Sequence, residues 1–124
     1  MTLSNWQETE CDASPMRLYV SVPEGAGPFP GLVVMQHQGG VDEFVQKITE
    51  RLAQGGYIAA APDLYHRDGP DCKDDIVTRR SRLSDRRILN DIAATIAFLQ
   101  RQESAAIASM GIIGFCMGGR LAYL

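Results

Sequence analysis

The sequence predicts an α/β fold, in which strands and helices alternate along one domain and build a mostly parallel sheet. Residues 31–36 and 57–61 form short, continuous apolar runs, as expected of strands that are covered on both faces. A segment with helical periodicity lies between these runs, and a longer one covers residues 85–101. This alternating order is typical of right-handed parallel βαβ units.

A strand and a turn are predicted ahead of these units. Residues 16–22 have strand character, and glycine and proline are concentrated in residues 23–28. Glycine permits positive φ and proline interrupts strand pairing, so the second segment favours a turn. We therefore predict an early hairpin at the N-terminal side of the sheet.

The helix between the apolar runs should begin after Asp42, whose carboxylate can cap the first turn. Gly55 and Gly56 provide its C-terminal end. The apolar residues of this helix recur at helical spacing and are Phe44, Val45, Ile48 and Leu52. A polar loop is expected to follow the second apolar run, over residues 62–84.

The helix predicted at 85–101 is amphipathic and should cover one face of the sheet. Its apolar stripe consists of Ile88, Leu89, Ile92, Ala93, Ile96, Ala97 and Leu99. The opposite, polar side is expected to carry Arg86, Arg87, Asn90 and Asp91. A third buried strand at 110–115 and a helix at 117–124 complete the predicted order.

A Gly-x-Cys-x-Gly motif at residues 114–118 lies between this last strand and this last helix. Strand, tight turn and helix form the context of a nucleophile elbow, where glycines permit a strained turn that exposes the central side chain. We therefore predict Cys116 as a nucleophile. Its sulfur would lie at a helix N-terminus, where unpaired N–H groups favour the thiolate.

The elbow also predicts an oxyanion hole. The N–H of Met117 would be one donor, and His37 or Gln38, in the loop after residues 31–36, would supply the second. His37 precedes the nucleophile, whereas the acid and base of this architecture follow it, so we interpret His37 as a pocket residue. Two other interpretations are a buried packing cysteine and a dinucleotide-binding turn, although the Gly-x-Gly-x-x-Gly spacing is absent.

The remaining reactive residue types carry weaker signals. Three cysteines, far apart, fit neither a disulfide framework nor zinc knuckles, and we interpret Cys11, Cys72 and His66 as surface or packing residues. No metal or cofactor is expected. A basic cluster, which would attract an anionic substrate or form a solvated face, consists of Arg79, Arg80, Arg82, Arg86 and Arg87.

Charge and hydropathy restrict the class of partner. The net charge is −3, without the basic stripe that is typical of nucleic-acid binding. The first ten residues lack the apolar core of a secretory signal, and no apolar run is long enough to span a bilayer. We expect a soluble, cytoplasmic protein with no nucleic-acid or membrane partner.

Over residues 16–124 the chain resembles the dienelactone hydrolases, on the basis of residues 41–44, 61–67 and 114–119. The resemblance implies an α/β-hydrolase that cleaves a small ester or lactone with a Cys, His, Asp triad and without metal or cofactor. Members of the family often act on carboxylate-bearing enol lactones. By motif, Cys116 takes the nucleophile position, and the N–H groups of Met117 and Gln38 take the oxyanion positions.

Two departures from the family pattern stand out. His37 occupies the position of a glutamate that controls the resting thiol in the best-known members, and the triad's Asp and His would follow Leu124. We therefore interpret residues 1–124 as the N-terminal part of one α/β-hydrolase domain, truncated after the elbow. Alone it should be inactive and, with an open sheet edge, prone to aggregation. Alternatives are a non-catalytic binding or regulatory protein and an inactive fragment.

Overall fold

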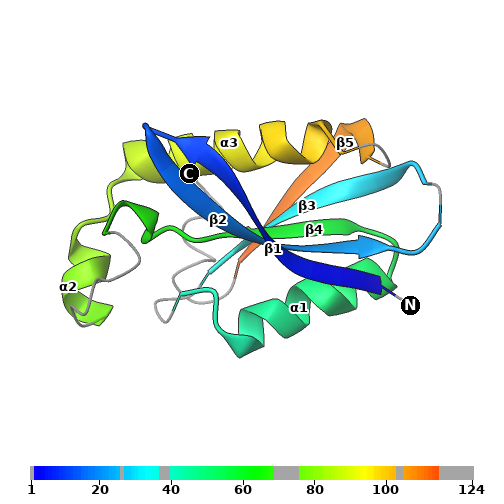
Figure 1. Cartoon of the computed structure of the whole chain (residues 1–124), viewed down its shortest axis with the longest axis horizontal. Helices are drawn as coiled ribbons and strands as arrows, with labels where there is room; N and C mark the ends of the chain where they lie inside the picture. The colour runs from blue at the N-terminus through cyan, green and yellow to red at the C-terminus, as the bar shows by residue number, and fades with distance from the viewer. Residues whose placement is uncertain (1, 26, 37–39, 69–75, 103–104, 115–124) are drawn as a thin grey trace.

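The computed structural model describes residues 2–25, 27–36, 40–68, 76–102 and 105–114. Five strands form one sheet in the order β1-β2-β4-β3-β5, and the helices α1 and α3 lie on its opposite faces (Figure 1). The strands are β1 Thr2–Cys11, β2 Ser14–Pro23, β3 Phe29–Met35, β4 Ile58–Pro62 and β5 Ala105–Gly114. The helices are α1 Glu43–Gln54, the short 3-10 helix η1 His66–Asp68, α2 Ile76–Ser81 and α3 Asp85–Gln100. The predicted α/β fold is confirmed.

The sheet combines a parallel part with an N-terminal hairpin. Strand β3 pairs in parallel with β4 and with β5, whereas β2 pairs antiparallel with β1 and with β4. These pairings make β1, β3, β4 and β5 run in the same direction, so their carboxyl ends meet at one edge of the sheet. Helices α1 and α3 run back from this edge, as βαβ connections require (Figure 1).

The hairpin is present, but its turn lies elsewhere than predicted. Asp12 and Ala13 connect β1 to β2 with positive φ angles of 54° and 59°. The segment 23–28 instead leads from β2 towards β3, and these strands are separated in the sheet by β4. The strand β1 was not predicted because it lies at the sheet edge and most of its side chains are exposed or half-buried, so its sequence lacks apolar alternation.

Strand β4 divides the core into two layers. Ile58 and Ala60 point into the layer beneath α3, and Ala59 and Ala61 point into the layer beneath α1, as the alternation of strand side chains requires. All five residues of β4 are therefore buried. This burial explains why the segment is a continuous apolar run.

Both long helices begin at capping side chains. The Asp42 carboxylate accepts a hydrogen bond from the Val45 N–H at 3.2 Å, which confirms the predicted cap of α1. Ser84 Oγ accepts from the Arg87 N–H at 3.3 Å and begins α3. The predicted polar loop at 62–84 contains η1 and α2. No helix in the described part of the chain is long and apolar enough to cross a membrane.

Candidate functional site

The candidate site is the side of the sheet at which the carboxyl ends of β1, β3, β4 and β5 meet. Met35, the last residue of β3, is paired with Gly114, the last residue of β5. The described parts of β3 and β5 therefore end side by side, β3 just before the predicted oxyanion segment and β5 at the first residue of the predicted elbow motif. The predicted site residues His37, Gln38, Cys116 and Met117 themselves lie outside the described residues.

A buried amide holds two loops together at this edge. Gln36 directly follows β3, and its side chain is fully buried. Its Oε1 accepts a hydrogen bond from the backbone N–H of Leu64 at 2.8 Å. A buried polar group with such a partner avoids the desolvation penalty of an unpaired one. The bond therefore connects Gln36, just after the end of β3, to the segment after β4.

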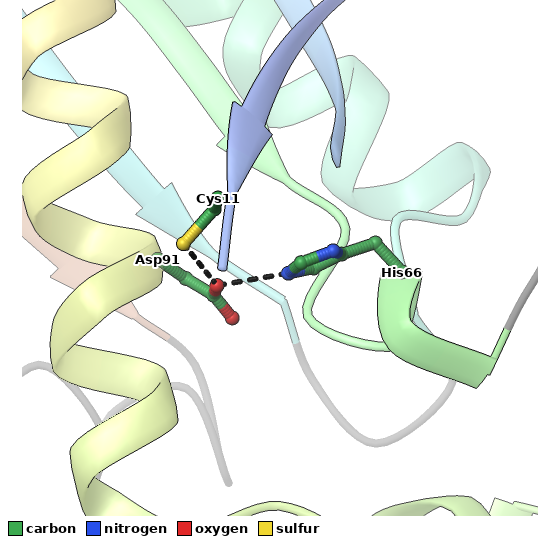
Figure 2. Close-up of side chains that lie close together, drawn as sticks. All are labelled: Cys11, His66 and Asp91. Atoms are coloured by element: carbon green, nitrogen blue, oxygen red, sulfur yellow. Dashed lines mark hydrogen bonds and ion pairs between the residues drawn. The ribbon is translucent and has the colours of Figure 1, made fainter. Parts of the chain in front are cut away.

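A second buried cluster lies at the same edge and is centred on Asp91 of α3 (Figure 2). Asp91 Oδ1 accepts a hydrogen bond from Cys11 Sγ at 3.2 Å and lies 2.9 Å from His66 Nε2. On its other side, His66 Nδ1 lies 3.1 Å from Ser14 Oγ. The three side chains come from the end of β1, the start of η1 and the middle of α3, so the cluster joins three separate segments.

Arg67 supplies the positive charge that compensates Asp91. Its Nη1 donates to Asp91 Oδ2 at 3.2 Å and its Nη2 donates to Asp91 Oδ1 at 3.0 Å. Arg67 Nη2 also bonds Asp12 at the hairpin turn, and this bond, followed by one from Asn90, lowers the pKa of the Asp12 carboxyl. Bidentate pairing with a guanidinium is the arrangement that best stabilises a buried carboxylate.

The Cys11, His66 and Asp91 cluster is not a catalytic triad. In a triad the histidine lies between the nucleophile and the carboxylate, whereas here the carboxylate lies between Cys11 and His66. Burial, followed by the hydrogen bond to Asp91, raises the pKa of the Cys11 thiol to about 12. At neutral pH the thiol is therefore protonated and is a poor nucleophile.

The stability contributed by Cys11 should depend on pH above neutrality. An unfolded thiol ionises near 9.0 and the folded one near 12, so the contribution is fully present below about pH 9 and is lost as the pH rises towards 12. We expect the difference in unfolding free energy between wild type and Cys11→Ala to shrink from about pH 8 to about pH 10.5. Urea denaturation of both proteins in metal-free buffer measures it. A difference that stays constant between about pH 8 and about pH 10.5 would contradict the raised pKa of the Cys11 thiol.

The interpretation of Cys11 and His66 as surface or packing residues fits their burial, and Cys11 belongs to the hydrophobic core cluster. The prediction that Asp91 lies on the polar side of its helix is wrong. Asp91 is instead fully buried, between Ile88 and Thr95 on the inner face of α3. Asp91 lies three residues after Ile88, and this spacing places both side chains on the same face of a helix. The sequence therefore carried a signal that Asp91 faces the core. Its partners, which lie 25 and 80 residues away in the chain, left no such signal.

A small hollow beside this cluster is lined by four arginines. Its volume is about 20 Å³, about the space of one water. It is lined by Leu64, Tyr65, Arg67, Arg79, Arg82, Leu83 and Arg87. The Arg79 guanidinium lies 4.8 Å from the centroid of the Tyr65 ring and donates to the Tyr65 carbonyl at 3.4 Å. Arg79, Arg82 and Arg87 of the predicted basic cluster thus line one hollow. Arg86 does not line it, and the side chain of Arg80 lies outside the described residues.

Comparison with known proteins shows which family the sequence of this chain resembles. The profile of the dienelactone hydrolase family matches residues 16–124. A candidate carboxymethylenebutenolidase from Methylorubrum extorquens is 36% identical over 111 residues, which cover 86% of this chain and 38% of the relative. One from Synechocystis sp. is 33% identical over 114 residues, which cover 86% of this chain and 46% of the relative.

Solved structures show the same likeness. The crystal structure of a candidate dienelactone hydrolase from Klebsiella pneumoniae superposes with a TM-score of 0.87 at 32% identity, over 98% of this chain and 52% of that one. A dienelactone hydrolase-like promiscuous phosphotriesterase from metagenomic libraries shares the fold, with a TM-score of 0.84 at 22% identity. The chain spans about half the length of these structures and less than half of the two curated relatives.

Proposed function

The chain belongs to the dienelactone hydrolase family, and from this membership we propose that the whole protein hydrolyses ester or lactone bonds with Cys116 as its nucleophile. Residues 1–124 would form the N-terminal part of one α/β-hydrolase domain. The observation that carries the proposal is the pairing of Met35 with Gly114. This pairing starts the predicted oxyanion segment and the elbow motif from adjacent points on one sheet edge.

The proposed reaction proceeds by acyl transfer. The Cys116 thiolate attacks the carbonyl carbon, and the N–H groups of Met117 and Gln38 donate to the oxyanion that forms. Collapse of this intermediate expels the alkoxide and leaves a thioester on Cys116. Water then attacks the thioester, with a histidine from beyond Leu124 as general base, and releases the acid. The bond between Gln36 and Leu64 supports this proposal because it anchors Gln36, the last described residue before the predicted oxyanion segment.

The arginines that line the small hollow favour a substrate with negative charge. Arg79, Arg82 and Arg87 bring positive charge to the same region of the molecule as the strand ends. Charges of one sign around a concave surface raise the local concentration of ligands with the opposite charge. We therefore propose a small ester or lactone that carries a carboxylate as the substrate.

The direct test is capture of the acyl-enzyme in the full-length protein. Nitrophenyl esters are mixed with the protein, the reaction is stopped with acid, and peptides are examined by mass spectrometry. We expect an acyl group on Cys116, and faster formation from a succinyl ester than from a neutral butyryl ester. Acylation of another residue would overturn the role of Cys116. No acylation at all would favour a non-catalytic binding or regulatory protein, and equal rates would overturn the proposed substrate charge.

A further inference from the structure

We propose that Cys11, His66 and Asp91 form a binding site for a divalent cation of the zinc class, separate from the Cys116 elbow. The cluster offers a thiol sulfur, an imidazole nitrogen and a carboxylate oxygen, and these three atoms lie within 4.8 Å of one another (Figure 2). All three residues are buried. Sulfur, nitrogen and oxygen from cysteine, histidine and aspartate are the donors that zinc binds in proteins.

The distances in the cluster suit a tetrahedral cation. Zinc binds sulfur at about 2.3 Å and nitrogen or oxygen at about 2.0–2.2 Å, which places neighbouring donor atoms about 3.2–3.7 Å apart. Cys11 Sγ already lies 3.2 Å from Asp91 Oδ1, and His66 Nε2 lies 2.9 Å from it. Entry of the cation therefore requires these two pairs of donors to separate by a few tenths of an ångström. The third pair, Cys11 Sγ and His66 Nε2, lies within 4.8 Å and must be brought to the same range of about 3.2–3.7 Å, which a turn of the Cys11 side chain would do. Three protein ligands leave the fourth position for a water.

Ser14 can hold the imidazole in the orientation that a metal requires. Without metal, the His66 proton can lie on Nε2 and donate to Asp91, while the Ser14 hydroxyl donates to Nδ1 across 3.1 Å. With metal, Nε2 must lose this proton, and Nδ1–H then donates to Ser14 Oγ. The hydroxyl hydrogen turns towards the His66 carbonyl, which lies 3.5 Å from Ser14 Oγ. Hydroxyl groups suit this exchange because they both donate and accept.

The charges around the cluster also accommodate a divalent cation. Arg67 carries one positive charge and Asp12 and Asp91 carry one negative charge each, so the group has a net charge of −1 when thiol and imidazole are neutral. A divalent cation that displaces the thiol proton to solvent brings this charge to zero. Arg67 Nη2 contacts Asp91 Oδ1 at 3.0 Å and Cys11 Sγ at 3.8 Å, and it must give up both contacts when these atoms turn to the metal. Arg67 can keep Asp91 Oδ2 through Nη1, at 3.2 Å, and Asp12 through Nη2.

The metal would act as a structural clamp. Its ligands would connect the end of β1, the start of η1 and the middle of α3, which are far apart in the sequence. Cation binding that requires the folded arrangement of all three segments stabilises the fold by linkage. This role does not depend on hydrolysis, so the proposed site and the proposed function can fail independently.

Cobalt titration of the full-length protein tests the site. Co²⁺ substitutes for zinc, and a thiolate ligand gives it a charge-transfer band in the near ultraviolet. Residues 1–124 contain three cysteines, so the double variant Cys72→Ser/Cys116→Ser leaves Cys11 as the sole thiol within these residues. We expect this variant, with chelator-stripped protein, to show the band at one Co²⁺ per chain and to release a proton on binding.

Ligand variants built on this background complete the test. Cys11→Ser should remove the charge-transfer band, and His66→Gln should weaken Co²⁺ binding by at least about tenfold. Ser14→Ala retains all three ligands and should weaken binding by about 10-fold to 100-fold. Circular dichroism establishes that each variant is folded. Absence of the band in the Cys72→Ser/Cys116→Ser protein, or its persistence when Cys11→Ser is added, would overturn the proposal.

Discussion

Replacing Asp91 by alanine is expected to lower the free energy of unfolding by about 3–5 kcal/mol, the loss seen when one partner of a buried ion pair is removed. The carboxylate is fully buried, and the Arg67 side chain that faces it is only 17% exposed. Without Asp91, the one carboxylate that Arg67 keeps among the described residues is the partly exposed Asp12, and Cys11 and His66 lose the oxygen that both contact. Urea denaturation of the full-length protein measures the loss.

Two comparisons make this expectation specific. Glu43 of α1 forms an exposed ion pair with Lys47 at 3.1 Å, and Glu43→Ala should change the unfolding free energy by less than about 0.5 kcal/mol. Combining Asp91→Leu with Arg67→Met removes both charges and should recover part of the loss, because no unpaired buried charge remains. A loss for Asp91→Ala no larger than that for Glu43→Ala would show that the cluster contributes little to stability.

Cys116→Ala in the full-length protein is expected to lower kcat for ester hydrolysis by at least about 10⁴-fold. Without the thiol no thioester can form, and water must attack the ester directly with only the oxyanion donors to assist. The substrate does not need the sulfur for its initial binding, so KM should change much less than kcat. Steady-state hydrolysis of a nitrophenyl ester measures both constants.

A second cysteine variant provides the control for this experiment. Cys72→Ala removes a thiol that the elbow motif does not include, and it should retain kcat within a few-fold of the wild type. If Cys116→Ala retained comparable activity, the nucleophile would lie elsewhere and the elbow interpretation would be wrong. If both variants lost activity with a lowered melting temperature, the loss would be attributed to folding and the acyl-enzyme experiment would decide the role of Cys116.

The sequence by itself determined the parallel half of the sheet and the helices that cover it. Residues 57–61 and 85–101 carry periodicities that depend only on neighbouring positions in the chain, and β4 and α3 lie close to those bounds. The Asp42 cap is equally local, because donor and acceptor are three residues apart. The elbow motif at 114–118 is also a local pattern and, joined to the family resemblance, it predicted the class of enzyme that the family match supports.

Only the tertiary structure decided the contacts between segments that are far apart in the chain. β1 is ordered by pairing with β2 along its whole length, although its own residues lack the alternation of a half-buried strand. The burial of Asp91 depends on Cys11 at the end of β1 and on the neighbouring His66 and Arg67 of η1, which come from two other places in the chain. A buried carboxylate is stable only with such partners. Because the sheet order brings them together, no local pattern could predict the cluster that they form.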